Sequence, residues 1–253
     1  MSTRVLEGKR AIVTGASRGI GAAIAARLAA EGAHVGLVAR GADDLAAVAA
    51  GIDGSTSVHA ADITDAAQSE SAVSAFVEAQ GGVDILVNNA GGNVRATAED
   101  TSLELWERLI RLGLTAPFHW SSLCAPSMRS AGWGRIVNIG SVAGMTALPT
   151  GAAYASAKAG LSQLTKNLAR EWGGDGVTVN LIAPWYVRTP LTEPVLSNDD
   201  FMDAVLACTP TGRIGTPEEV AAAVAFLCGT EAGWLNGASI PLDGGFSGAS
   251  FYP

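Results

Sequence analysis

The sequence is poor in charged residues and has no long apolar run. Asp, Glu, Lys and Arg make up 16% of its 253 residues, below the roughly one quarter of a typical soluble domain. No apolar run approaches the ~20 residues of a membrane-spanning helix. The opening stretch MSTRVLEGKRAIVTG shows no apolar core followed by a cleavage site. We therefore expect a cytoplasmic protein, with part of its sparsely charged surface buried against other copies of the chain.

Cysteine is scarce as well. Cys124, Cys208 and Cys228 are odd in number, far apart and embedded in apolar stretches. A disulfide framework needs paired cysteines, whereas reduced thiols are typical of cytosolic proteins. The sequence predicts three buried, reduced thiols.

Basic runs and metal-binding motifs are missing too. The formal net charge is −8, so a nucleic-acid backbone would meet no positive field, and we expect no nucleic-acid partner. An anionic ligand would need local basic residues instead. Because neither CxxC nor HExxH occurs in the sequence, we also expect no metal site.

What the sequence does contain is an alternation of short β-branched runs with Ala-rich stretches. This alternation predicts an α/β fold, a single Rossmann-like domain over residues 1–253 with a doubly wound sheet of seven mainly parallel strands flanked by helices. The strand candidates are nearly all apolar, as expected when helices cover both faces of a sheet. A substrate lid is predicted around 184–210, because Pro184 to about Asn198 is a long irregular stretch. The strand candidates lie at 10–14, 34–39, 57–62, 83–88, 134–141, 177–184 and 238–243.

A glycine-rich segment, VTGASRGIGAAIA, follows the first strand candidate and opens a long helix. Small residues there let the backbone approach a pyrophosphate at the helix N-terminus. Gly15, Gly19 and Gly21 have the spacing GxxxGxG, and with 31 glycines in the chain this pattern alone is a weak signal. A plain strand-to-helix turn stays open as an alternative.

Two arginines indicate which dinucleotide would bind. Arg18 lies inside the glycine segment, and Arg40 follows the second strand candidate, where Ala39 supplies no carboxylate. An acidic residue near this strand end would hold the ribose 2′-hydroxyl of NAD, whereas arginine suits a 2′-phosphate. The pair favours NADP over NAD; the alternative is that both are solvated surface charges.

Tyr154 and Lys158 are four residues apart in a helical stretch, so they share one helix face. A tyrosine hydroxyl titrates near ~10, and an ammonium ~4 Å away would lower this pKa to about 7 at most. That range suits general acid and base catalysis. The alternative is an ordinary surface pair, but the surrounding Ala and Gly leave room for a ligand.

Ser141 ends the fifth strand candidate. Strand ends of this kind border the ligand crevice, where a hydroxyl would donate to a developing alkoxide. A nucleophilic role is the poorer interpretation, because no GxSxG surrounds Ser141. Nor can any of His34, His59 and His119 be assigned as its base.

The stretch WERLIRLGLTAPFHW, Trp106 to Trp120, has helical periodicity but contains two helix-weakening residues, Gly113 and Pro117. Proline has no N–H, so the carbonyl of Gly113, four residues earlier, lacks its usual helical partner on an apolar face. A buried unpaired carbonyl is costly, so water or another donor is expected there. Alternatively, Gly113 simply makes room for a neighbour.

Taken in order, TGASRGIG, NNAG at 88–91, Ser141 with YASAK, and VTVNLIAP resemble the short-chain dehydrogenase/reductase family, from about Lys9 to Phe246. The resemblance implies a Rossmann-like domain and a homodimer or homotetramer. It also implies that Ser141 polarises a substrate carbonyl, that Tyr154 exchanges the proton, and that Lys158 tunes the tyrosine and binds the nicotinamide ribose.

The same resemblance implies an NADP(H) site built from strand ends and loops. Asp62 and Ile63 would flank the adenine, and Val187 and Thr189 would hold the carboxamide. The expected cofactor-binding residues are Gly15, Ser17, Arg18, Gly19, Ile20, Gly21, Arg40, Asp62, Ile63, Asn89, Ala90, Gly91, Tyr154, Lys158, Pro184, Val187 and Thr189.

Two positions depart from the family pattern. Trp185 follows Pro184 where the family usually has glycine, which resembles the tropinone-reductase-like branch, as does DGGFSG near the C-terminus. Gly113 stands where the pattern W-D-x-x-x-x-V-N has a catalytic asparagine; in the family this region holds a water that links the lysine to bulk solvent. We keep Gly113 as a candidate catalytic position, at which water would replace the amide and leave the enzyme active but slowed.

The sequence therefore predicts an NADP-dependent carbonyl reductase or alcohol dehydrogenase for a small to medium, largely apolar ketone or secondary alcohol. One alternative is an NADP-binding protein impaired in catalysis by Gly113. Another is a 3-oxoacyl-acyl-carrier-protein reductase, whose acidic carrier would need basic residues beside the pocket, with Arg129 and Arg135 as candidates. The expected substrate-pocket residues are Val94, Arg95, Val142, Leu148, Trp185, Tyr186 and Leu191.

Overall fold

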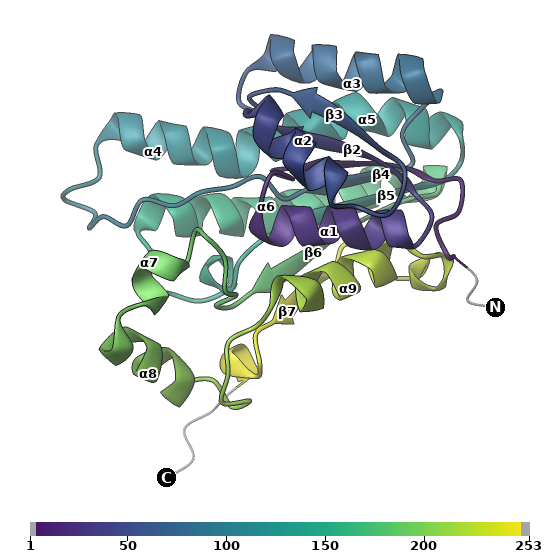
Figure 1. Cartoon of the computed structure of the whole chain (residues 1–253). Helices are drawn as coiled ribbons and strands as arrows, with labels where there is room; N and C mark the ends of the chain where they lie inside the picture. Colours follow the sequence, from purple (N-terminus) through teal and green to yellow (C-terminus); the bar gives the residue numbers. More distant parts are fainter. Residues whose placement is uncertain (1–3, 249–253) are drawn as a thin grey trace.

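Seven strands form one sheet through the middle of the protein (Figure 1). The computed structural model describes residues 4–248, so residues 1–3 and 249–253 of the predicted 1–253 domain lie outside the described part. The strand order is β3-β2-β1-β4-β5-β6-β7, and every neighbouring pair is parallel. The strands are β1 Arg10–Thr14, β2 His34–Ala39, β3 Thr56–Ala60, β4 Ile85–Asn88, β5 Gly134–Ile139, β6 Val177–Pro184 and β7 Ser239–Leu242.

This sheet confirms the predicted doubly wound α/β fold, since each strand candidate overlaps an observed strand. The strand order reverses between β1 and β4, which creates a crevice at the carboxyl ends of these strands. One expectation is wrong. β3 lies at the sheet edge and is not covered on both faces, and its Val58 is 39% exposed.

Helices cover both faces of the sheet (Figure 1). Alternate residues of β1 point to opposite faces: Ala11 and Val13 pack with residues of α1 and α9, whereas Ile12 packs with residues of α3 and α5. The helices are α1 Gly19–Ala30, α2 Ala42–Ala50 and α9 Pro217–Cys228 on the first face, and α3 Ala66–Gln80, α5 Ala116–Ser130 and α6 Ala152–Trp172 on the second. Shorter elements are α4 Leu103–Ile110, α7 Glu193–Leu196, α8 Asp199–Ala207 and the 3₁₀ turns η2 Val142–Gly144, η3 Gly173–Asp175, η4 Thr230–Ala232 and η5 Phe246–Gly248.

The helix predicted through Trp106–Trp120 changes register between α4 and α5. A π-helical turn, η1 Arg111–Thr115, joins them, and the N–H of Ala116 bonds to the carbonyl of Arg111, five residues back instead of four. Pro117 then falls in the first turn of α5, where a missing N–H is tolerated. The irregularity expected at Gly113 and Pro117 is therefore a π-helical turn centred on Gly113.

The segment predicted as an irregular lid contains helices. α7 and α8 both fall within 184–210, and they lie away from the sheet at the lower left of Figure 1. The side chain of Asn198 caps α8 by accepting the N–H of Phe201 at 2.8 Å. The expectation of a structureless stretch up to Asn198 is therefore wrong.

Two of the three cysteines are buried as predicted. Burial raises the pKa of the Cys124 and Cys228 thiols to about 12. Cys208, by contrast, is exposed, because it ends α8, which lies outside the main core.

Candidate functional site

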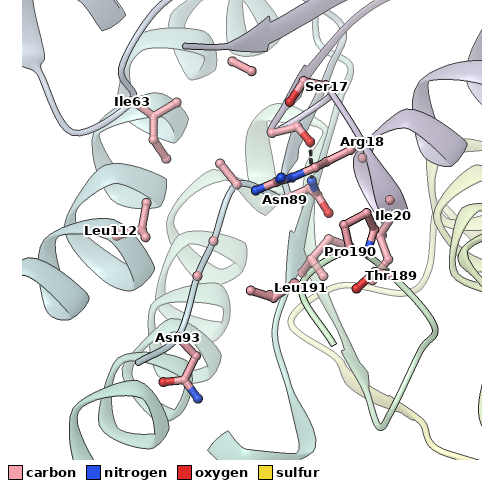
Figure 2. A pocket seen from close by; sticks show the side chains of 18 of the residues that line it. Ser17, Arg18, Ile20, Ile63, Asn89, Asn93, Leu112, Thr189, Pro190 and Leu191 are labelled. Atoms are coloured by element: carbon pink, nitrogen blue, oxygen red, sulfur yellow. Dashed lines mark hydrogen bonds between the residues drawn. The ribbon is translucent and has the colours of Figure 1, made fainter. Parts of the chain in front are cut away.

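A cleft of about 810 Å³ lies at the carboxyl ends of the strands, where the strand order reverses. Every residue predicted to bind the cofactor lines it, and so does Ser141. Figure 2 shows Ile63 and Leu112 on one wall, with Arg18 and Thr189 opposite them. The residues that the family resemblance implied for the cofactor, spread over most of the chain, therefore lie together along one cleft.

The glycines after β1 are required chiefly by contacts inside the protein. The φ angles of Gly15 and Gly19 are +67° and +56°, values that favour glycine. A Cβ at Gly15 would lie 2.7 Å from the Cα of Ala90, and one at Gly21 would lie 2.1 Å from the Gly15 oxygen. For Gly15 and Gly21 the reason for glycine is therefore packing, rather than the ligand approach expected from the sequence.

Asn89 ties this turn to the end of β4. Its side-chain amide donates to the carbonyl oxygens of Thr14 at 2.9 Å and Gly15 at 3.2 Å. In return, the hydroxyl of Thr14 accepts the N–H groups of Asn89 and Ala90, both at 3.1 Å. These bonds hold the glycine turn in place beside the cleft.

The start of α1 fits a phosphate anion. Arg18 is the residue before its first turn, and no side chain caps the helix there. Ser17, Arg18, Gly19 and Ile20 line the cleft at this point. Because uncapped N–H groups at a helix N-terminus bind anions, these residues fit the diphosphate of a dinucleotide.

Arg18 and Arg40 both line the cleft and are exposed. Within residues 4–248, neither forms an ion pair, so both guanidinium groups are available to a ligand. Sequence reasoning missed Asp44, which also lines the cleft beside Gly41. Asp44 belongs to the first turn of α2 rather than to a strand end, where the acidic residue was sought.

Ser141, Tyr154 and Lys158 come together beyond the end of β5, and all three line the cleft. The Ser141 hydroxyl accepts the N–H of Ala143 at 3.2 Å, which leaves its own proton free to be donated. Tyr154 and Lys158 lie one turn apart on α6, with Lys158 Nζ 5.8 Å from the centre of the Tyr154 ring.

The electrostatics of this trio differ from the expectation. Lys158 is 6% exposed and donates to the Ile139 carbonyl at 2.8 Å, and burial lowers its pKa to about 8. Burial also raises the pKa of Tyr154, an effect that outweighs the lowering by the neighbouring Ser141 hydroxyl, and Tyr186 adds to the rise. The direction of the Tyr154 pKa shift in the protein alone is therefore opposite to the predicted one. A raised pKa favours the protonated tyrosine, which is the form that can donate a proton.

Gly113 does not line the cleft, although its neighbour Leu112 does. It is buried, and a Cβ at this position would lie 2.9 Å from the Cβ of Ala157. Of the two interpretations of Gly113, the structure supports packing against α6. This partner could not be predicted from the sequence, because the contact joins two helical segments far apart in the chain.

Sequence reasoning missed a buried polar network that connects the strands and helices next to the site. The side-chain amide of Asn88 donates to Asn138 Oδ1 at 2.8 Å and to Ser121 Oγ at 3.1 Å. Asn138 in turn donates to Thr165 Oγ1 at 2.9 Å. These bonds join β4, β5, α5 and α6, and the signal for them was a polar residue ending each of two apolar strands.

The substrate end is predicted less well. Val94, Trp185 and Leu191 line the cleft, but the structure corrects the other four positions. Val142 is only 1% exposed and belongs to the interior, and Arg95, Leu148 and Tyr186 lie outside the lining. Residues of the cleft wall that were not predicted include Asn93, Arg108, Leu109, Leu112, Pro190 and Thr192.

Trp185 and Tyr186 instead contact other parts of the chain. The rings of Trp185 and Phe246 are stacked, with their centroids 3.9 Å apart and an angle of 7° between their planes. The indole N–H of Trp185 donates to Thr209 Oγ1 at 3.1 Å. The Tyr186 hydroxyl accepts a hydrogen bond from Arg95 at 2.6 Å. These contacts fix the segment after β6 between the loop that carries Arg95 and the C-terminal part of the chain.

The arginines suggested for an acidic carrier lie elsewhere. Arg135 starts β5, is 5% exposed and has its guanidinium carbon 4.4 Å from the centre of the Trp133 ring. Arg129 pairs with Asp175 at 2.5 Å. Both positions are at the amino end of β5, opposite the cleft. Neither residue provides the basic surface beside the pocket that was expected.

Within residues 4–248, no three His, Cys, Asp or Glu side chains are grouped so that they could hold a metal ion. Among the helices of the same range, none is long and apolar enough to cross a bilayer.

Comparison with known proteins places the chain in a family. A family model described as enoyl-(acyl carrier protein) reductase matches residues 15–247. A tropinone reductase homologue from Arabidopsis thaliana is 41% identical over 249 residues, 96% of this chain and 93% of the relative. A structure described as that of a short-chain alcohol dehydrogenase from Sinorhizobium meliloti 1021 superposes with a TM-score of 0.94, at 36% identity, covering 98% of this chain and all of the other.

The chain belongs to the short-chain dehydrogenase/reductase family. Tropinone reductase homologues are among its relatives, in agreement with the Pro184-Trp185 pattern. A further structural match, described as an NAD(P)-dependent gluconate 5-dehydrogenase from Beutenbergia cavernae with NADP bound at low occupancy, has a TM-score of 0.92 and 36% identity over 98% of this chain and all of the other. The protein is an oxidoreductase that acts on alcohol and carbonyl groups, as predicted.

Proposed function

We propose that this short-chain dehydrogenase/reductase is an NADP-dependent carbonyl reductase that also oxidises the corresponding secondary alcohol. One observation carries the proposal: Tyr154 lies beside Ser141 and Lys158 in a cleft whose other end holds two arginines that form no ion pair within residues 4–248. The bound nicotinamide would supply the hydride in reduction and accept it in oxidation.

The side chains divide the remaining work. With its oxygen accepting the N–H of Ala143, Ser141 donates its own proton toward the substrate carbonyl and stabilises charge that develops there. Tyr154 delivers its proton to the same oxygen as an alcohol forms. Lys158 places a cation below this pair, oriented by the carbonyl of Ile139. In alcohol oxidation the same groups act in reverse, with Tyr154 accepting the proton.

The choice of NADP rests on Arg18 and Arg40, which would pair with a 2′-phosphate. NADP bound to the gluconate 5-dehydrogenase relative supports this choice. Asp44 is the counter-argument, because a carboxylate at this end of the cleft would repel a phosphate and could hold a ribose hydroxyl. Within residues 4–248 neither guanidinium group pairs with a carboxylate, so both remain available to the phosphate.

The substrate proposal follows from the wall at the other end. Val94, Leu112, Trp185 and Leu191 line it, so a small to medium ketone with an apolar body would bury its carbon skeleton there. We place the lid over this end at 184–210, on a single catalytic domain. We also expect a homodimer or homotetramer in the cytoplasm.

Purified protein, NADPH and a panel of ketones test the proposal, with NADPH absorbance as the readout. Turnover of free ketones supports it. A second candidate is a 3-oxoacyl-acyl-carrier-protein reductase, which the wording of the matched family model favours; activity that requires the carrier would establish that function instead. Tight NADPH binding without turnover, unchanged in Tyr154→Phe, would establish a protein impaired in catalysis.

A further inference from the structure

The backbone of α6 around Lys158 is held by three contacts that leave no room for a side chain. A Cβ at Gly113 would lie 2.9 Å from the Cβ of Ala157, and one at Gly144 would lie 2.6 Å from the carbonyl carbon of Lys158. A Cβ at Gly160 would lie 2.8 Å from Cδ2 of Leu114. Gly113 and Leu114 belong to the π-helical turn, whereas Gly144 ends the 3₁₀ turn that begins after Ser141. α6 is thus packed between the π-helical turn and the 3₁₀ turn.

The contact at Gly113 has little freedom to adjust. Its partner, the Cβ of Ala157, moves only with the backbone of α6, and Ala157 is 1% exposed. The π-helical turn cannot move away on its own, because Leu114 packs against Gly160 on the same side of α6. Added atoms at position 113 therefore displace α6 itself.

Lys158, the next residue after Ala157, depends on that backbone. Its ammonium donates to the Ile139 carbonyl at 2.8 Å in a buried setting. A hydrogen bond of this kind weakens steeply as the two atoms separate. A small displacement of α6 therefore moves the ammonium relative to Ile139 and to Tyr154.

We propose that Gly113 is a positioning residue for Lys158, because the absence of a side chain lets the π-helical turn lie against Ala157 and sets the place of the lysine ammonium. The role in turnover rests on the proposed function, in which Lys158 supports proton transfer by Tyr154. In this account glycine at position 113 is a requirement of the α6 contact, and an asparagine there would be harmful rather than restorative.

A double-mutant cycle tests the contact. Gly113→Ala should lower kcat for ketone reduction about tenfold, and Ala157→Gly in the same chain should restore most of it by removing the opposing Cβ. Gly174→Ala is the matched control, since a Cβ at Gly174 would meet nothing within 4 Å. Alanine is favoured over glycine in a helix, so a loss in Gly113→Ala measures the contact and not helix propensity. Gly113→Asn should lose activity too.

A second readout needs no turnover. The only lysines are Lys9, Lys158 and Lys166, so ¹³C-lysine NMR can follow the titration of Lys158 in the protein without cofactor, assigned with Lys9→Arg and Lys166→Arg. Loss of the Ile139 acceptor should lower the pKa of Lys158 in Gly113→Ala, with recovery in the double variant. If no ketone turns over, the proposed function fails while this titration still tests the positioning.

An unchanged Lys158 pKa in Gly113→Ala, or a loss that Ala157→Gly does not rescue, would overturn the inference. A rise of kcat in Gly113→Asn would overturn it as well, because the missing amide would then matter more than the contact.

Discussion

The two ends of the cleft differ in how strictly the fold determines them. At the cofactor end, Gly15, Arg40 and Asn89 directly follow β1, β2 and β4, so the sheet fixes their positions. At the substrate end, Val94 and Leu191 come from loops, and Trp185 is held by contacts with Phe246 and Thr209 far along the chain. Cofactor binding therefore depends on the sheet, whereas substrate choice depends on loops that can vary without changing the sheet.

The largest effect is expected where the two ends meet. Tyr154→Phe removes the proton donor and should lower kcat by about 10²–10⁴-fold. Affinity for NADPH should change little, because the phosphate and adenine contacts lie elsewhere. Steady-state kinetics with a titration of NADPH fluorescence would check both, and a variant that keeps most of its kcat would refute the role of Tyr154.

At the cofactor end, Arg40→Asp should move preference from NADP toward NAD. Loss of a charge-assisted hydrogen bond is worth about 1.5–3 kcal/mol, so the NADP/NAD ratio of kcat/KM should fall roughly 10- to 100-fold. Arg170→Asp is the control, since Arg170 is exposed near the end of α6 and does not line the cleft. An unchanged ratio in Arg40→Asp would rule out the 2′-phosphate contact.

At the substrate end, Trp185→Ala should raise the KM for ketone with little change in the KM for NADPH. The stack on Phe246 and the bond to Thr209 are lost, and aromatic pairs of this kind are worth about 0.5–1.5 kcal/mol, or roughly 2- to 10-fold. Trp185→Phe should recover part of the effect. Equal increases in the KM for ketone and the KM for NADPH would contradict the difference between the two ends of the cleft.

The smallest expected effect is on protein stability, and it arises on β2 and β3, away from both ends of the cleft. Ser57 Oγ is within 3.0 Å of His34 Nε2 and 2.9 Å of His59 Nε2. Burial lowers the pKa of both histidines, and for His59 the proximity of His34 adds to this. The folded state therefore favours the neutral rings, so their contribution to stability is present above the unfolded pKa of ~6.5 and is lost as pH falls below it.

Melting temperatures between pH 7.5 and 5 measure this contribution. The decrease toward pH 5 should be smaller in the double variant His34→Gln/His59→Gln than in the wild type. Parallel curves for the two proteins would show that these histidines do not couple to folding.

The sequence was sufficient for the sheet, because β-branched runs and glycine turns are local signals. It was also sufficient for the cofactor end of the cleft, since strand ends converge there whatever the loops do. It could not reveal that Gly113 packs on Ala157, nor that Val142 turns into the interior, because both depend on how elements far apart in the chain approach each other. The direction of the Tyr154 pKa shift was mispredicted for a similar reason, because burial is a tertiary property that the four-residue spacing to Lys158 does not reveal.

Deuterium transfer from NADPH that carries deuterium at both C4 positions of the nicotinamide shows directly whether the hydride reaches a ketone. The label should appear on the carbinol carbon of the alcohol formed from a small apolar ketone, with one deuterium per NADPH consumed, and Tyr154→Phe should suppress this transfer. Tight binding of NADPH with no label passed to any ketone of the panel would contradict the proposed function.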